Sequence, residues 1–435
     1  MTKKQLLGLF VLLTRVAGLE ASVADSRYFP WYPHMYERTL QKRSIFDVGA
    51  FFVTASSARG NESIERISIP EIWGVYDQKQ LSDALGILGK QTPLLAQWQL
   101  QRSIAWDVKG KMEGQGAYLQ IEYGTKNGFS AGVTTSIMHL TSDQRFTIPA
   151  GIKQGSLYNS DPLRDLGLTP SQQEQLDAER RQMQEMLGFT DAQWSATGFT
   201  DTEFHVRYGV LDEYRMKCRK VDIGAFAGVL VPSGIKRQPN NPASVPFGGN
   251  GHTGFYCGAE GMFELKEDWE LSIRLQVSKR LAKTQRERMS INYESLLWGA
   301  IEGPVRIDPG ASFLFTPAFT MHDLRDGFGA GIQYCLAVHG GDVWTDRRVD
   351  QTIPTTLNGL KGAGSGGYLI KGVYETSQWG AEYIVATIFY DPDKVTKDEG
   401  IRPHIVFQWD VPIHFLVSER VSKTNIISLG LSFHF

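Results

Sequence analysis

The last twelve residues of the chain, residues 424–435, read TNIISLGLSFHF. One side of a period-two pattern is almost entirely apolar: Asn425, Ile427, Leu429, Leu431, Phe433 and Phe435. The other side is mostly small or polar: Ile426, Ser428, Gly430, Ser432 and His434. Because successive side chains of a strand point to opposite faces, this stretch predicts a strand whose two faces meet different solvents.

The same alternation recurs in long stretches elsewhere, near residues 221–231, 269–277, 307–319, 328–338 and 405–417. Strands in soluble proteins are mostly about 5–6 residues long, whereas these are long enough for a tilted strand to cross a bilayer. Only a closed barrel pairs every backbone N–H and C=O in hydrocarbon. A soluble β-sandwich is the alternative, but it seldom sets charges beside so many glycines on one face over such lengths.

We therefore predict an all-β fold, a transmembrane antiparallel β-barrel with helical insertions in its loops. We expect about 14 strands, within a range of about 12–16. They are near 43–58, 102–113, 115–125, 128–140, 200–213, 218–232, 252–265, 268–281, 305–321, 326–341, 367–376, 379–391, 402–417 and 423–435. Barrels place short turns in the periplasm and long loops outside. With this count and a periplasmic C-terminus, tight connections such as 266–268 and 322–327 fall on the outer side. One strand is therefore misassigned, and the stretch 288–298 is the candidate.

The composition fits this fold and excludes others. The chain has 435 residues, 42% of them hydrophobic, and a net charge of -2, with a mean hydropathy of -0.24. That mean excludes a bundle of membrane-spanning helices, which needs repeated apolar runs of about 20 residues. The charge gives no reason to expect nucleic acid as a partner. Cys218, Cys257 and Cys335 are too few for a disulfide framework or a cysteine-rich metal site.

The N-terminus predicts export. Lys3 and Lys4 precede an apolar run over 6–13, and residues 22–24, Ser-Val-Ala, suit a signal peptidase cutting before Asp25. We therefore expect residues 1–24 to be a signal peptide; an amphipathic N-terminal helix of a cytosolic protein is the alternative.

These two ends resemble those of bacterial outer-membrane β-barrel proteins, whose last strand alternates and ends in Phe. The resemblance implies a porin-like or transporter-like protein of the Gram-negative outer membrane, in contact with outer-membrane lipid. It also implies that the barrel assembly machinery reads the C-terminal strand, here through Leu429, Leu431, Phe433 and Phe435.

Residues 25–42 precede the first strand and hold an aromatic cluster: Tyr28, Phe29, Trp31, Tyr32 and Tyr36. In size, strand number and this segment the chain is similar to the long-chain fatty-acid transporters, in which an N-terminal segment plugs the lumen. That similarity is one of architecture, without a family motif. It implies that residues 25–42 plug the lumen of a barrel over 43–435; an aromatic belt at the membrane interface is the other interpretation.

Two long connections carry helical patterns, near 77–88 and 169–188. The second has Thr169 as N-cap, Pro170 at the first helical position, Gln172 completing a capping box and Gly188 at its end. It predicts a helix on a surface or over a pore mouth. The loops 232–251 and 359–367, rich in glycine, are expected to be mobile.

If the strand registers are right, ionisable residues face the lumen, because a midplane Arg or Lys facing lipid costs about 2–4 kcal/mol. The pore-lining candidates are Asp107, Lys109, Glu122, Arg207, Asp222, Glu260, Glu270, Arg274, Arg306, Asp308, Asp410 and His414. Arg274 and Arg306 could pair with Glu260, Glu270 or Asp308 on neighbouring strands. Acids predominate, which favours a mild preference for cations, although ion pairs that stiffen the wall are the favoured interpretation of any single residue.

The function predicted is an outer-membrane channel or transporter passing small solutes or hydrophobic compounds. The alternatives are a surface adhesion or recognition barrel and, less favoured, an outer-membrane enzyme of lipase or protease type. No HExxH pattern occurs in the sequence, and we expect no enzyme, no catalytic residue, no metal and no cofactor. The charged stretch 342–348 could bind a ligand or ion, or form pairs within a solvated loop.

The C-terminal interpretation is testable by deleting Phe435. We expect the shortened chain to assemble poorly in the outer membrane, because its last strand loses the aromatic residue that the assembly machinery reads. The measurement is the folded fraction in membranes, scored by the gel shift between unboiled and boiled samples. Deletion of a residue from the loop 359–367 is the control, and normal assembly without Phe435 would remove the C-terminal signal from the argument.

Overall fold

The structure is a computed structural model that describes residues 26–29, 44–61, 66–99, 103–125, 127–147, 152–154, 164–166, 169–190, 192–214, 217–349, 370, 372–395 and 402–434. The predicted signal peptide and Phe435 lie outside these residues. Within the described part, every helix is too short or too polar to cross a bilayer.

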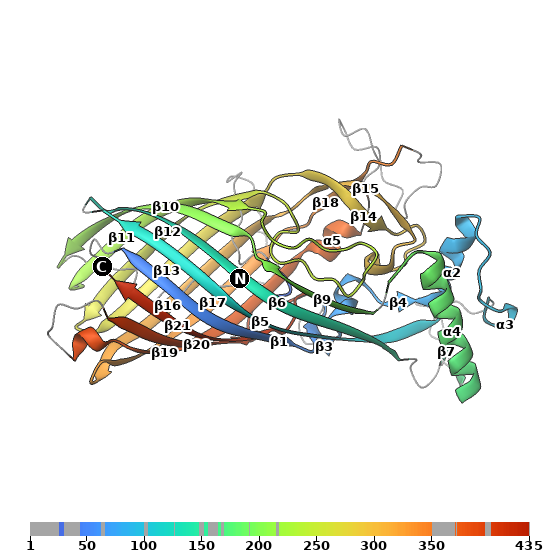
Figure 1. The fold of residues 1–435 in the computed structure, drawn as a ribbon, viewed down its shortest axis with the longest axis horizontal. Coiled ribbons are helices and arrows are strands. Elements are labelled where there is room, and N and C mark those ends of the chain that lie inside the picture. The colour runs from blue at the N-terminus through green and yellow to red at the C-terminus, as the bar shows by residue number, and fades with distance from the viewer. Residues whose placement is uncertain are drawn as a thin grey trace.

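Twelve strands form a closed antiparallel barrel in which each strand pairs with its neighbours along the chain (Figure 1). They are β1 (Ile45–Ala55), β5 (Ala105–Gly124), β6 (Phe129–Thr147), β10 (Thr202–Glu213), β11 (Lys220–Val231), β12 (Gly254–Lys266), β13 (Trp269–Arg280), β16 (Ala311–Arg325), β17 (Phe328–His339), β19 (Trp379–Tyr390), β20 (Pro403–Pro412) and β21 (Asn425–His434). Pairing of β1 with β21, from Ile45↔His434 to Thr54↔Asn425, closes the cylinder. The predicted fold class is confirmed.

The two ends of the barrel differ in their connections. Short turns lie at one end, between β5 and β6, β10 and β11, β12 and β13, and β16 and β17. The start of β1 and the end of β21 lie at this short-turn end, because Ile45 pairs with both His434 and Glu122. The connection between β19 and β20, residues 391–402, also lies at this end, because Tyr390 pairs with Phe328. The longest connections lie at the other end. The conflict over the tight turns therefore disappears, since 266–268 and 322–327 are both at the short-turn end.

The strand number is twelve rather than fourteen for two reasons. The predicted strands 102–113 and 115–125 are one strand, β5, of 20 residues. The predicted strand 367–376 is replaced, where described, by the short helix α5 (Val373–Ser377). Residues 288–298 are not a missed barrel strand; they end β14 (Lys283–Met289) and include the 3₁₀ turn η2 (Leu296–Trp298).

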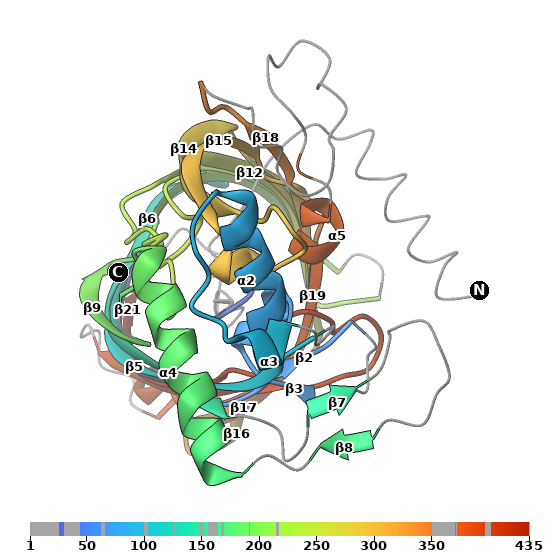
Figure 2. The same ribbon diagram turned by 90° about the vertical axis from the view of Figure 1, so that its right-hand side faces the viewer.

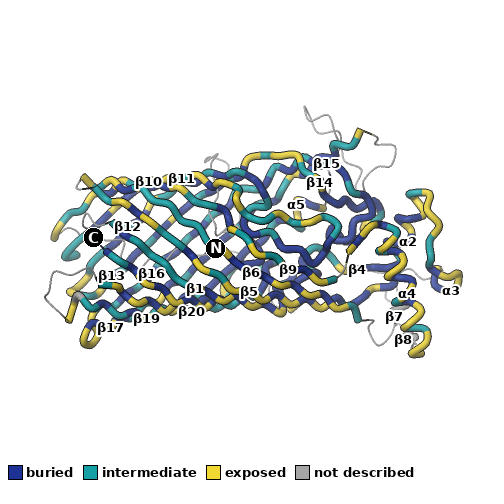
Figure 3. Tube along the Cα trace, viewed as in Figure 1, coloured by how far each residue is buried: buried dark blue, intermediate teal, exposed yellow. Residues whose placement is uncertain are grey.

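Exposed and buried residues alternate along the strands of the barrel wall (Figure 3), and the exposed positions are largely apolar while many buried ones are polar. On β21, Ile427, Leu429 and Leu431 are exposed on the outer face. Ser428 and Ser432, between them, are buried on the inner face. A surface that exposes rows of large apolar side chains is matched to lipid, while the inner face can hold water or a ligand.

The long hairpin of β5 and β6 extends beyond this apolar band and corrects two pore-lining predictions. In this part, Trp106, Val108 and Met112 are buried. Asp107 and Lys109 point outward instead, with side chains 44% and 69% exposed. The alternation persists, but the outer face here meets water rather than lipid. Charged side chains therefore lie on the outer face in this part of the barrel and on the inner face within the apolar band.

The long connections fold into a cap over one end of the barrel, where α2 and α4 cross in front of the opening (Figure 2). Both predicted helices occur: α2 (Gln78–Ile87) and α4 (Pro170–Met186). Helix α4 has the Thr169 capping box as expected. Leu176 and Met183 of α4 join one apolar core with Leu81 and Leu85 of α2.

The remaining elements of the cap are small. A sheet of three strands contains β14, β15 (Ile301–Asp308) and β18 (Val343–Asp346). The others are β2 (Ala58–Arg59), β3 (Arg66–Ile67), η1 (Pro70–Trp73), β4 (Tyr76–Asp77), α3 (Ala96–Gln99), β7 (Ile152–Gln154), β8 (Arg164–Leu166) and β9 (Gln193–Phe199). A further 3₁₀ turn, η3 (Pro392–Lys394), follows β19 near the short-turn end.

The lipid-facing assignment is testable with Leu429→Arg. An arginine on the apolar band should lower the free energy of unfolding by about 2–4 kcal/mol. The same change at Thr141, which points outward above the band, should cost much less because the new charge meets water. Urea titration of both variants in lipid vesicles measures the difference; equal effects at the two positions would contradict the location of the band.

Candidate functional site

Seven of the predicted pore-lining residues do lie on the inner face of the barrel: Glu122, Arg207, Asp222, Glu260, Glu270, Arg274 and Asp410. Arg207 bridges two acids, with Nη2 2.8 Å from Asp222 and Nε 2.5 Å from Glu260. Arg274 Nη1 lies 3.5 Å from the other oxygen of Glu260, as predicted from their neighbouring strands. Its guanidinium also lies 3.9 Å from the ring centre of Phe226.

Polar contacts continue along the same wall toward β5. Ser130 donates a hydrogen bond to Glu122 at 2.6 Å, and His205 Nε2 lies 3.6 Å from the other Glu122 oxygen. Glu203 accepts a hydrogen bond from the Tyr256 hydroxyl. Polar contacts therefore occur on six adjacent strands, from β5 to β13, inside the barrel, in two groups.

The opposite wall is less charged. Gln408 donates to Asp410 at 2.6 Å, and both are buried. The rings of His404 and His434 lie 4.4 Å apart, with His434 2.9 Å from the Ser432 hydroxyl. Glu270 lies nearer the short-turn end, 3.5 Å from His322.

Three further pore-lining predictions are wrong, in addition to Asp107 and Lys109. Arg306 and Asp308 belong to β15, which pairs with β14 and β18 rather than with barrel strands. The pattern over 307–319 runs without interruption, but Pro309 and Gly310 break the strand and its pairing. His414 lies beyond the end of β20, with Nδ1 3.8 Å from Glu382. Phe415, next to it, is 73% exposed, so this loop stands out from the wall.

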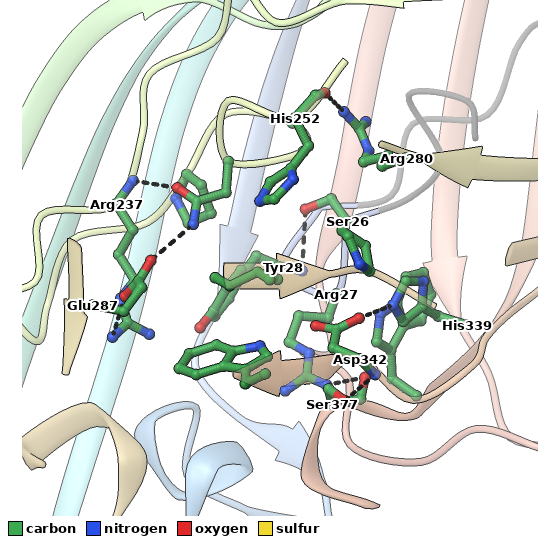
Figure 4. Close-up of a pocket in the computed structure, with 18 of the residues that line it drawn as sticks. Ser26, Arg27, Tyr28, Arg237, His252, Arg280, Glu287, His339, Asp342 and Ser377 are labelled. Atoms are coloured by element: carbon green, nitrogen blue, oxygen red, sulfur yellow. Dashed lines mark hydrogen bonds and ion pairs between the residues drawn. The ribbon is translucent and has the colours of Figure 1, made fainter. Parts of the chain in front are cut away.

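A cavity of about 130 Å³ occupies the mouth of the barrel at the capped end. Its walls come from the ends of several strands together with loops (Figure 4). They include Arg27, Trp73, Arg237, His252, Arg280, Glu287, His339, Asp342, Trp344 and Trp379. It therefore joins parts of the chain that are hundreds of residues apart.

Residues 26–29 form one wall of this cavity and are buried. Arg27 Nη2 donates to the carbonyl oxygens of Thr376 and Ser377 at 3.0 and 2.7 Å. The Ser422 backbone N–H donates to the Arg27 carbonyl at 2.9 Å, and Trp73 Nε1 donates to the Tyr28 hydroxyl at 2.7 Å. Tyr28 and the neighbouring Phe29 are buried here, so this part of the aromatic cluster is not an interfacial belt; Trp31, Tyr32 and Tyr36 lie outside the described residues.

The loop 232–253 forms another wall and is held by a buried ion pair. Arg280 Nη1 lies 2.7 Å from Asp201, whose side chain is fully buried. Asp201 also accepts from the Gly249 N–H at 2.8 Å, and Phe247 is fully buried. The glycines and prolines that suggested mobility instead allow close packing, because a Cβ on Gly234 would lie only 1.9 Å from the Phe247 carbonyl oxygen.

Two arginines approach the Trp73 ring within the cavity. The guanidinium carbon of Arg27 lies 4.3 Å from the ring centre, and that of Arg237 lies 5.9 Å from it. Arg237 is paired with Glu287 at 3.4 Å. Arg27 has no ion pair among the described residues, and burial lowers its pKa to about 10, against the opposing effect of Asp342. Desolvation also lowers the pKa of His252.

His339 is fixed by a chain of hydrogen bonds at the edge of the cavity. Ser312 Oγ lies 2.7 Å from His339 Nδ1, and His339 Nε2 lies 3.0 Å from Asp342. The Trp379 ring stacks on the imidazole at 5.6 Å with an interplanar angle of 11°. His339 and Asp342 line the cavity, whereas the buried Ser312 lies behind them. The arrangement therefore orients the imidazole rather than presenting a nucleophile to the cavity.

Sequence reasoning missed most of the cavity. Arg280 had a signal, since it continues the inward positions of β13 after Arg274 and Gln276. The charged stretch 342–348 also proves to have two parts. Asp342 and Trp344 line the cavity, while Arg348 pairs with Asp346 at 2.8 Å. Arg27, Trp73 and Arg237 carry no periodic signal. Among the described residues, no group of three or more metal-binding side chains converges.

A closed barrel with an apolar outer face, a polar lumen and a capped mouth defines a transmembrane β-barrel protein. The sequence matches no protein-family model and no curated protein. Among solved structures, it is similar to an outer membrane channel from Pseudomonas putida F1, with 10% identity, a TM-score of 0.47, and 93% of this chain and 100% of that chain covered.

Two other solved barrels match over similar lengths. The TodX deltaS2S3 mutant, a monoaromatic hydrocarbon channel, has 9% identity and a TM-score of 0.36, covering 96% of this chain and 97% of its own. The translocator domain of the autotransporter NalP from Neisseria meningitidis has 10% identity and a TM-score of 0.33, covering 92% and 90%. These similarities concern the overall barrel shape alone.

The lumen network is testable with Arg207→Ala. Removing the guanidinium leaves Asp222 and Glu260 close together without their shared cation, which should lower the free energy of unfolding by about 3 kcal/mol. Arg219→Ala is the matched control, because Arg219 is half-exposed in its pairs with Glu264 and Glu267, and such pairs contribute at most about 1 kcal/mol. Urea titration compares the two; similar losses would mean that the network adds little to stability.

Proposed function

We propose that this protein is an outer-membrane channel that passes small solutes or hydrophobic compounds. The observation that carries the proposal is the polar inner surface of a closed barrel whose outer surface suits lipid. The inner wall of the described strands bears acids at Asp47, Glu122, Glu203, Asp222, Glu260, Glu270 and Asp410. Below the mouth, Arg207 and Arg274 oppose them, and Lys220 pairs with a further acid, Glu264, near the short-turn end. Acids therefore outnumber cations among the described inward positions, which supports a mild preference for cations.

The proposed orientation follows the rule that outer-membrane barrels keep short turns in the periplasm and long loops outside. The capped end with its cavity would then face the exterior, and both the start of β1 and the end of β21 would face the periplasm. Export would use residues 1–24, and assembly would use the C-terminal strand.

Residues 25–42 are proposed as a plug. Support comes from two observations. Residues 26–29 are buried at the capped end, and β1, the next barrel strand, begins at the short-turn end. The start of the segment and the strand that follows it therefore lie at opposite ends of the barrel. Phe29 contacts Phe247 with ring centres 6.1 Å apart, so this segment and the loop 232–253 narrow the mouth together.

Surface recognition is the second candidate. Support for it comes from the size of the cap, in which α2, α4 and the β14–β15–β18 sheet share an apolar core beyond the barrel wall. The polar outer face of α4 would then contact the partner. Enzymatic activity is not part of the proposal.

The channel proposal is testable in planar lipid bilayers. We expect discrete conductance steps from the purified protein, and a reversal potential displaced toward that of the cation in a salt gradient, because acids predominate on the lumen wall. A folded barrel that produces no steps would favour surface recognition. A reversal potential on the anion side would contradict the proposed selectivity.

The plug provides the matched comparison. Deleting residues 25–42 from the mature chain should increase the conductance, because the segment would no longer obstruct the lumen. The barrel itself should stay intact, because none of its strands is removed. The gel shift between unboiled and boiled samples controls for folding. Equal conductance with and without the segment would mean that it does not obstruct the lumen.

A further inference from the structure

The mouth cavity contains a buried positive charge that has no anionic partner in contact among the described residues. Arg27 is 6% exposed, and its Nη1 has no hydrogen-bond partner within the described part of the chain. The two hydrogen bonds of Nη2 go to neutral carbonyl oxygens of Thr376 and Ser377. A buried guanidinium normally has a carboxylate or phosphate partner, because its desolvation is otherwise costly.

The nearby acids are engaged elsewhere. Glu287 pairs with Arg237 at 3.4 Å and accepts from Asn250 at 3.2 Å. Asp342 accepts from the Gly310 N–H at 2.9 Å and lies 3.0 Å from His339. Asp201 pairs with Arg280 at 2.7 Å. An anion that reached Arg27 would therefore not have to compete with these three acids for its guanidinium.

Aromatic side chains form the other walls of the cavity. Trp73, Trp344 and Trp379 line it together with Tyr28. Flat apolar walls favour a flat apolar body, and a guanidinium fork favours a carboxylate, which it can bind through two parallel hydrogen bonds. The volume of about 130 Å³ has room for about ten water-sized groups, so the ligand must be small.

We propose that the mouth cavity binds a small aromatic carboxylate, with its carboxylate on Arg27 and its ring among the tryptophans. The inference rests on the proposed function only in taking the cavity as part of a solute path. The arginines of the wall below, Arg207 and Arg274, are paired with acids, whereas Arg27 has no ion pair among the described residues, so the anion is held at the mouth rather than deeper in the lumen.

Calorimetric titration of the mature, detergent-solubilised protein tests the proposal with sodium benzoate as the probe. Benzoate should bind about tenfold or more tightly than benzyl alcohol, which has the ring but no charge, because a hydrogen bond to a charged group is lost. Cyclohexanecarboxylate, which has the charge but no flat ring, should bind more weakly than benzoate. Equal binding of benzoate and benzyl alcohol, or no benzoate binding, would overturn the proposal.

Variants locate the site. Arg27→Gln should weaken benzoate binding about tenfold or more, whereas Arg219→Gln, an arginine at the short-turn end, should leave it unchanged. Arg27 lies outside the barrel strands, and the gel shift verifies that each variant is folded. Benzoate binding that Arg27→Gln does not weaken would overturn the assignment. The two proposals fail separately: a silent barrel that binds benzoate contradicts only the channel, and a conducting barrel that does not bind it contradicts only this inference.

Discussion

The pairing of β1 with β21 is the constraint on which the rest of the structure depends. In hydrocarbon an unpaired strand edge leaves a row of N–H and C=O groups without partners, so the first and last strands must meet in register. Once Ile45 pairs with His434, the antiparallel barrel has an even number of strands, both of these strand ends lie at the same end, and successive connections alternate between the two ends. A mouth built from long loops follows from that closure.

Sequence patterns identified the wall well because lipid imposes the same demand on each strand. Leu429, Phe407 and Leu275 face outward and Glu260 and Arg274 inward, as period two predicts. The period-two pattern gave wrong pore-lining residues where the alternation continued but the strand had left the lipid-facing band or the barrel wall. Lys109 alternates as regularly as Glu122 but lies above the apolar band, and Arg306 precedes a break at Pro309. The cavity escaped because Arg27, Trp73 and Arg237 meet through loops, whose positions depend on tertiary contacts and not on local periodicity.

Single carboxylates hold several of the long connections. Asp201 joins the loop 232–253 to β13. Glu294 accepts from the backbone of Ile291, Asn292 and Ala300 at 2.6–3.0 Å. Glu382 accepts from four successive amides, residues 415–418, at 2.7–3.1 Å. A buried carboxylate that receives several N–H donors satisfies both its own charge and the backbone of an irregular loop, so these loops can be compact without regular secondary structure.

The contacts of residues 26–29 have a consequence for the order of events during biogenesis. The Arg27 carbonyl accepts from the backbone of Ser422, 395 residues later, and the Arg27 side chain reaches Thr376 and Ser377. None of these partners exists until nearly the whole polypeptide has been made and its final strands are in place. The segment made first after the predicted cleavage site can therefore take up these contacts only after the strands near the C-terminus have been made.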